Sequence, residues 1–185
     1  MSGAARAHVL AEPPFALREL ELPQAAGEAV PRVLIVDASG AACAGESPAA
    51  VQERALREWL RRFDAEATAT HSSRSYRLPL ALLAWHGAPV GVDIERVECM
   101  DAAFASSIQT PREREQEPPR ERDAYFSSLW SSKEALSKAL GDPVAYDPRR
   151  LEGPGSWPHG RSGPWRAAQL EVGAAHVAWV CWRVL

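Results

Sequence analysis

The chain has 185 residues and a net charge of −3, with 46% hydrophobic and 24% charged residues. These values are typical of a soluble globular protein that forms one domain or two small halves. The slightly negative charge gives no general attraction to nucleic acid, and no segment is apolar enough to span a bilayer or to form the core of a signal peptide. We therefore expect a cytoplasmic protein that uses neither nucleic acid nor a membrane as a partner.

The three cysteines, Cys43, Cys99 and Cys181, are far apart and odd in number. They show neither the spacing of metal ligands nor that of a redox pair, so a reduced environment is the simplest interpretation.

The first predicted elements are a short buried strand at residues 33–36 and a helix within "AAVQERALREWLRRF". One face of this helix is predicted to be apolar, and it consists of Val51, Ala55, Leu56, Trp59, Leu60 and Phe63. The arginines fall elsewhere on the helix, at positions 54, 57, 61 and 62. They form either a solvated basic face or an anion-binding site, and the sequence leaves both alternatives open.

Two further strands are predicted at residues 80–85 and 90–95, joined as a hairpin by "HGAP". The segment "TPREREQEPPRERDA" that follows is charged and interrupted by prolines, so it is either an exposed connection or a mobile flap over a site. The clearest helix covers residues 123–140, and Gly141 is a suitable residue to end it.

Residues 142–164 are rich in proline and glycine, and "EGPGSWPHGRSGP" within them is predicted to be a loop. Residues 165–185 are predicted to form a final hairpin. The order of elements indicates an α+β protein with mainly antiparallel strand pairing. The sequence contains no G-x-G-x-x-G or Walker-type loop, which disfavours the standard nucleotide-binding folds.

Two carboxylates are predicted to share one face of a strand in "PVGVDIE". Residues two apart on a strand point the same way, roughly 7 Å apart, so Asp93 and Glu95 lie on the face opposite to the apolar residues. Gly91 belongs to the same face and leaves space beside it. Two like charges at this distance raise one another's pKa unless a cation intervenes. The alternative interpretation is an ordinary solvated strand face.

A glutamate and a lysine are four residues apart in "WSSKEALSKALG". Glu134 and Lys138 have the spacing of an ion pair that stabilises an exposed helix by roughly 0.2–0.5 kcal/mol. The other possibility is that Glu134 is a third carboxylate beside Asp93 and Glu95. Magnesium prefers oxygen ligands and leaves positions open for phosphate, and a nearby lysine would neutralise charge on a breaking phosphorus–oxygen bond.

"GVDIE" followed about forty residues later by "WSSKEALSKALG" closely resembles the 4′-phosphopantetheinyl transferases of the surfactin-synthetase type. The family pattern is Gly-hydrophobic-Asp-hydrophobic-Glu, then Trp/Phe-Ser-x-Lys-Glu-Ala-x-x-Lys and a glycine. The residues that match it are Gly91, Asp93, Glu95, Trp130, Ser131, Lys133, Glu134, Ala135, Lys138 and Gly141.

A third family element, Asn-x-Ser-His-Ser, is similar to "TATHS" in this chain. His71 and Ser72 match it, while Thr68 and Thr70 replace the asparagine and the first serine. Thr70 keeps a hydroxyl group that can contact a phosphate, whereas Thr68 loses an amide.

The resemblance covers roughly residues 54–140. It implies a pseudo-twofold fold of two similar α/β halves, residues 1–88 and 89–185, with coenzyme A bound in the cleft between them and a monomer able to complete its own site. It also implies a set of site residues. Magnesium ligands are Asp93, Glu95 and Glu134; catalytic groups are Glu134 and Lys138; coenzyme A contacts are Thr70, His71, Lys133, Lys138 and, by position, Arg54 or Arg57. An acidic residue near the acceptor would be Glu113 or Glu115.

The implied activity is that of a 4′-phosphopantetheinyl transferase, or holo-[acyl-carrier-protein] synthase. It moves phosphopantetheine from coenzyme A to a serine of an apo acyl or peptidyl carrier protein in a magnesium-dependent reaction, and it releases adenosine 3′,5′-bisphosphate. Two departures favour an alternative, a family-like protein that binds coenzyme A or a carrier domain without turnover. The first fifty residues contain few lysines and arginines, and "TATHS" differs from the family motif.

Overall fold

The computed structural model describes residues 15–23, 27–39, 48–65, 70–116, 120–142 and 147–185. Cys43 and Thr68 fall outside these residues, and so does the side chain of Val51, although its backbone is helical.

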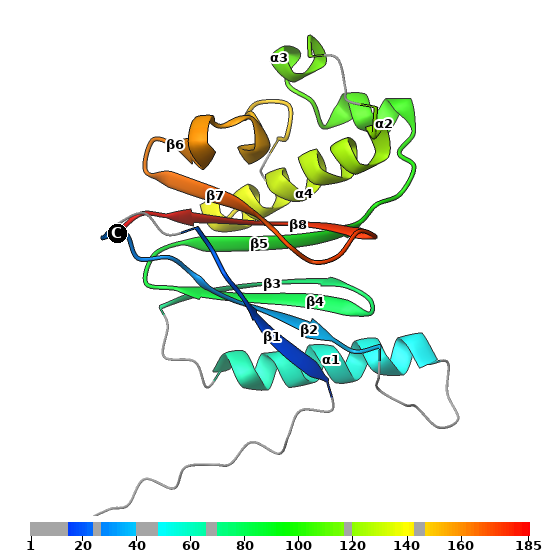
Figure 1. Ribbon diagram of the computed structural model, residues 1–185, viewed down its shortest axis with the longest axis vertical. Helices are drawn as coiled ribbons and strands as arrows, with labels where there is room; N and C mark the ends of the chain where they lie inside the picture. The colour runs from blue at the N-terminus through cyan, green and yellow to red at the C-terminus, as the bar shows by residue number, and fades with distance from the viewer. Residues whose placement is uncertain (1–14, 24–26, 40–47, 66–69, 117–119, 143–146) are drawn as a thin grey trace, which may run out of the picture.

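The first sheet has four antiparallel strands in the order β1-β2-β4-β3. Their bounds are Ala16–Leu20 (β1), Arg32–Asp37 (β2), His71–Arg77 (β3) and Leu80–His86 (β4). The two strands predicted at residues 33–36 and 80–85 are confirmed as β2 and β4. Helix α1, Pro48–Ala65, covers the outer face of this sheet (Figure 1).

The second sheet also has four antiparallel strands, in the order β5-β8-β7-β6. Their bounds are Val90–Arg96 (β5), Arg161–Ser162 (β6), Trp165–Leu170 (β7) and His176–Arg183 (β8). The predicted final hairpin is confirmed as β7 and β8. The long predicted helix is confirmed as α4, Arg122–Leu140, and it ends at Gly141, whose φ of +82° favours glycine.

The molecule is built in four layers, α1, the first sheet, the second sheet and α4 (Figure 1). The inner faces of the two sheets form one core, in which Val33, Ile35 and Leu82 pack with Val92 and Val180. This arrangement confirms the α+β class with antiparallel pairing. The pseudo-twofold relation and the division at residue 88 stay predictions.

The apolar face of α1 is only partly as predicted. Leu56 and Leu60 are fully buried under the first sheet, and Trp59 and Phe63 stack on one another with ring centroids 4.9 Å apart. Ala55 is exposed, so its assignment to this face was wrong. A small side chain at the border of the apolar stripe gains little from burial, which is why the pattern alone misplaced it.

The predicted hairpin across "HGAP" is wrong, although both of its strands exist. Strand β4 pairs with β2 on one side and β3 on the other, so neither of its edges is left for β5. Strand β5 instead pairs with β8 in the second sheet. The segment "HGAP" is therefore the connection between the two sheets.

Two short helices precede α4, and only the second of them lies in the segment predicted as a charged connection or flap. They are α2, Ala102–Ser107, and α3, Pro111–Arg114. Helix α3 begins with a capping box, in which the Thr110 side chain accepts from the Glu113 amide and the Glu113 side chain accepts from the Thr110 amide. The Pro- and Gly-rich segment contains two 3₁₀ turns, η1 at Pro154–Ser156 and η2 at Pro158–Gly160.

None of the helices in the described residues is long and apolar enough to cross a membrane. Cys99 is an exposed free thiol and Cys181 a buried one, and burial raises the pKa of the Cys181 thiol.

Candidate functional site

Helix α4 lies directly on β5, and Gly91 is the residue that allows this approach. A Cβ atom at Gly91 would lie 2.0 Å from the Ala135 carbonyl oxygen and 2.5 Å from the Ala139 nitrogen. The space that the sequence predicted beside Gly91 is therefore occupied by the backbone of α4. This contact brings the polar face of β5 against the helix that carries Glu134 and Lys138.

Asp93 is the centre of the polar cluster between β5 and α4. Its side chain is 5% exposed, and its Oδ1 accepts hydrogen bonds from Ser75 Oγ and Lys138 Nζ, both at 2.8 Å. Lys138 Nζ also donates to the Val92 carbonyl at 3.2 Å. Lys138 therefore reaches back from α4 to Asp93 instead of pairing along the helix surface.

Glu95 lies two residues further along the same face of β5. It forms an ion pair with Arg77 at 2.5 Å and accepts a hydrogen bond from the Trp130 side chain. Burial, and after it the negative charge of Asp93, raises the pKa of Glu95 above its ordinary value, while Arg77 opposes this shift.

Glu134 is half-buried on α4 and shares the surroundings of Asp93. Burial raises the pKa of Glu134, the charge of Asp93 raises it further, and Lys138 partly compensates. Since the Asp93 charge acts on both Glu95 and Glu134, the structure brings the three predicted carboxylates into one electrostatic cluster.

Strand β3 connects this cluster to the first sheet, and sequence analysis missed the strand. Its odd-numbered residues reach β5: Ser73 Oγ accepts from the Val92 amide at 3.1 Å, Ser75 donates to Asp93, and Arg77 pairs with Glu95. The sequence "HSSRSYR" has no apolar alternation, which is the signal by which strands are usually found.

A pocket of about 450 Å³ opens between α1, β3 and the C-terminal end of α4. Its basic residues come from three elements, and Arg57 lies over the Tyr76 ring, 4.3 Å from the centroid. The lining residues are Arg57, Arg61, Ser72, Ser73, Arg74, Tyr76, Lys138 and Gly141. Lys138 thus belongs to both the pocket and the acidic cluster. Sequence analysis did not select Arg74 or Tyr76.

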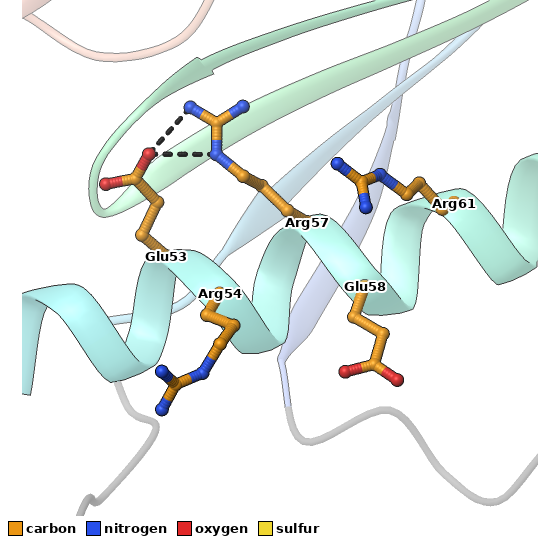
Figure 2. Close-up of a pocket in the computed structure, with 5 residues that line it drawn as sticks. All are labelled: Glu53, Arg54, Arg57, Glu58 and Arg61. Atoms are coloured by element: carbon orange, nitrogen blue, oxygen red, sulfur yellow. Dashed lines mark hydrogen bonds and ion pairs between the residues drawn. The ribbon is translucent and has the colours of Figure 1, made fainter.

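A second hollow, of about 510 Å³, runs along the surface of α1 and is lined only by side chains of that helix. Figure 2 shows Arg54 and Glu58 extending from one side of α1 and Arg57 from the opposite side, where it pairs with Glu53 at 2.6 Å. Arg57 and Arg61 line both hollows, whereas Arg54 lines only the outer one. Of the two arginines predicted to contact coenzyme A, the structure therefore favours Arg57, which lines the same pocket as Lys138.

Three of the predicted coenzyme A contacts, Thr70, His71 and Lys133, are not among the residues that line the pocket. Thr70 and His71 immediately precede the lining residue Ser72, Thr70 being exposed and His71 half-buried. Lys133 has no exposed surface at all. Its ammonium group is fully engaged inside the second half of the chain, so the predicted contact between Lys133 and coenzyme A has no support in this geometry.

The two candidates for an acidic residue near the acceptor have opposite environments. Glu115 is exposed, and Glu113 is 2% exposed and paired with Lys133 at 2.6 Å. The pattern Thr-Pro-x-Glu at residues 110–113 is the signature of a capping box with proline at the first helical position. It could have predicted α3 and the hydrogen bond of Glu113 to the Thr110 amide, but not the burial of Glu113.

The carboxylate cluster has the chemistry of a site for a hard cation. Asp93 Oδ2 is buried and has no hydrogen-bond partner among the described residues, and the charge of Asp93 disfavours ionisation of both neighbouring glutamates. All of the donor atoms are oxygens, as magnesium prefers. In the described part of the chain, however, no three side chains of His, Cys, Asp or Glu are grouped closely enough to hold a metal ion as they stand.

Comparison with known proteins places this cluster in a family context. Residues 89–160, which include β5, α3 and α4, match the family model of the 4′-phosphopantetheinyl transferase superfamily. The predicted superfamily resemblance is thereby confirmed. The chain is also 39% identical over 62 residues to the 4′-phosphopantetheinyl transferase psf-1 of Bacillus pumilus. This similarity covers 32% of the chain and 27% of the length of that relative.

The segment that matches the family model contains the three carboxylates and Lys138, whereas α1 and β3 lie outside it. The arginines of the pocket are therefore assigned from the structure of this chain alone.

The raised pKa values make the free energy of unfolding depend on pH. Because Glu134 binds its proton more tightly in the folded state, folding is favoured at acidic pH, and this contribution is lost as the pH rises from the ordinary glutamate pKa through the raised one. We expect Glu134→Gln to flatten this part of the pH profile, measured by urea unfolding at several pH values between about 4 and 7. Replacing Glu121, exposed at the start of α4, with Gln serves as the control. An unchanged slope in Glu134→Gln would contradict the half-buried placement of this carboxylate beside Asp93.

Proposed function

We propose that the protein transfers 4′-phosphopantetheine from coenzyme A to a serine hydroxyl of an apo acyl or peptidyl carrier protein and releases adenosine 3′,5′-bisphosphate. The observation that carries this proposal is the double role of Lys138. Its ammonium group contacts Asp93 in the acidic cluster, and its side chain lines a pocket with three arginines. The protein thus offers a basic pocket that suits a substrate with several phosphates, directly beside the carboxylates of the candidate reaction centre.

The pocket suits the phosphates of coenzyme A. Guanidinium groups bind phosphate in bidentate geometry, and Arg57, Arg61 and Arg74 all line this pocket. The hydroxyl groups of Ser72 and Ser73 add hydrogen-bonding capacity. We assign the diphosphate to the end of the pocket near Lys138, because the bond that breaks must lie close to Asp93 and Glu134.

The chain's own residues account for the proton and the charge in the transfer. The serine oxygen forms a bond to the phosphorus that carries pantetheine, and the bond from that phosphorus to the departing bisphosphate breaks. Glu134 takes the serine proton, because it is the half-buried carboxylate that α4 places beside Asp93 and Lys138. Lys138 neutralises the charge that grows on the leaving phosphate.

Asp93, Glu95 and Glu134 would hold a magnesium ion, which when bound supplies positive charge against the diphosphate. The unpartnered Asp93 Oδ2 is the observation that favours this assignment.

Mass spectrometry of a carrier protein tests the proposal. The protein is incubated with coenzyme A, magnesium chloride and several apo carrier proteins, and the phosphopantetheine adduct is the expected product. Omission of magnesium and addition of a chelator are the matched controls. Absence of an adduct on every carrier, despite measurable coenzyme A binding, would favour the alternative of a binding protein without turnover.

Two adjacent arginines on α1 allow a test of the pocket that does not depend on turnover. Both are exposed, but Arg61 lines the pocket, whereas Arg62 pairs with Glu58 and is not among the lining residues. We expect Arg61→Ala to weaken coenzyme A binding about tenfold, the effect of losing a charge-assisted hydrogen bond to phosphate. Arg62→Ala should leave the dissociation constant nearly unchanged. Titration calorimetry measures both dissociation constants. Equal effects of the two substitutions would show that coenzyme A does not bind in this pocket.

A further inference from the structure

A buried ion pair lies on the side of α4 that faces away from the pocket. Lys133 Nζ donates to three acceptors, Glu113 Oε2 at 2.6 Å, the Ile108 carbonyl at 2.7 Å and the Pro148 carbonyl at 2.6 Å. An ammonium group has three hydrogens, so its donor capacity is used completely. The side chains of Lys133 and Glu113 are 0% and 3% exposed.

The Glu113 carboxylate is equally occupied. Its Oε1 accepts from the Gly153 amide at 2.6 Å, and its Oε2 accepts from the Thr110 amide at 2.8 Å in addition to Lys133. Both oxygens are engaged and the side chain is 3% exposed, so a substrate hydroxyl does not reach this carboxylate. Glu113 therefore does not act as a base near the acceptor.

The pair connects four segments that are distant in the sequence. Lys133 belongs to α4, Ile108 ends α2, Glu113 belongs to α3, and Pro148 and Gly153 belong to the segment before η1. A single buried ion pair thus connects α4 to the end of α2, to α3 and to the segment before η1.

The position of Lys133 on α4 determines what this contact controls. Glu134 is the next residue, about 100° further around the helix, and Lys138 is on the same side as Glu134. Ala135, whose carbonyl lies against Gly91, is about 200° from Lys133 and hence on roughly the opposite side. The helix is held by Gly91 on one side and by Glu113 on the other.

We propose that Glu113 and Lys133 are positioning residues that fix the rotation of α4 about its axis and thereby aim Glu134 and Lys138 at Asp93. In its catalytic consequence this inference rests on the proposed function. A buried ion pair contributes little net stability compared with apolar side chains of similar volume, so a geometric role explains its presence better than stabilisation does.

The double variant Glu113→Gln/Lys133→Met tests this role. It removes both charges together and leaves no buried charge without a partner, so its Tm should fall much less than that of a variant that removes one charge, although the Ile108 and Pro148 carbonyls lose their donor. The turnover number for transfer should still fall on the order of tenfold to a hundredfold, because small displacements of catalytic groups have effects of this size. The single variant Lys133→Met, which strands the Glu113 charge, should lose both stability and activity.

A second readout requires no activity. Lys138→Met removes the ion pair with Asp93 and is expected to lower the Tm of the wild type. In the double-variant background this decrease in Tm should be largely lost, because Lys138 is no longer aimed at Asp93. If the double variant does not fold, Glu113→Asp replaces it, since the shortened carboxylate keeps its charge but does not reach both Gly153 and Lys133.

The outcomes separate the two proposals. A double variant that recovers full turnover, and in which Lys138→Met lowers the Tm as much as in the wild type, would overturn the positioning role. A wild type without transferase activity would overturn the proposed function, and the Tm comparison would still decide the role of Glu113 and Lys133.

Discussion

Asp93→Asn is expected to reduce the rate of phosphopantetheine transfer on the order of 10²–10³-fold while the protein stays folded. Asparagine has the shape of aspartate, and its carbonyl can still accept a hydrogen bond from Ser75 or Lys138. The negative charge that holds Lys138 and attracts a cation is removed. Product release is measured by chromatography of adenosine 3′,5′-bisphosphate, and folding is checked by circular dichroism and Tm.

Glu171→Gln is a suitable control for this experiment, because Glu171 is exposed in the turn between β7 and β8. Its rate should match that of the wild type. Full activity in Asp93→Asn would show that the cluster between β5 and α4 is not the reaction centre.

Gly91→Ala is expected to be the most damaging small substitution for the fold. The added Cβ would meet the backbone of α4 at 2.0 Å and 2.5 Å, and backbone atoms have no flexible end that can move aside. Overpacking of this kind costs about 1–3 kcal/mol, which lowers the Tm by several degrees in a chain of this length. The transfer rate should fall as well, because the displaced helix carries Glu134 and Lys138.

Gly155→Ala is the matched control. A Cβ at Gly155 would lie 3.5 Å from the Trp179 ring, which is an ordinary contact distance. We expect calorimetric scans to show a Tm close to that of the wild type. A Gly91→Ala protein as stable and active as Gly155→Ala would mean that α4 does not lie as closely on β5 as described.

Local patterns predicted the elements that have a strong period and clear ends. Helix α4 has apolar residues at helical spacing and a glycine at its C-terminus, and β2, β4 and β5 are continuous apolar or alternating runs. The alternation in β5 also predicted correctly that Asp93 and Glu95 share the face opposite to the sheet core. These features depend on neighbouring residues only, so the sequence contains them directly.

The pairing of strands and the surroundings of single side chains depend on distant residues, and here prediction was weaker. Strand β3 is polar and was missed, because its stability comes from pairing with β4 and from the contacts of its serines with β5. Lys133 was expected to contact coenzyme A because it lies in the motif "WSSKEALSKALG". It is buried because Glu113, twenty residues earlier in the sequence, provides its counter-charge. The convergence of Glu134 with Asp93 was suggested by the paired motifs and not by the spacing of either one.

The two faces of β3 contact different parts of the molecule, and this limits the insertions and deletions that the strand can tolerate. Ser75 and Arg77 serve the carboxylates, whereas Arg74 and Tyr76 lie toward α1, opposite side chains of β4 that pack under that helix. Since successive side chains alternate in direction, a gain or loss of one residue inside His71–Arg77 would exchange the two groups and turn Arg74 or Tyr76 toward Asp93. The length of this short polar strand is therefore as restrictive as the identity of the residues it carries.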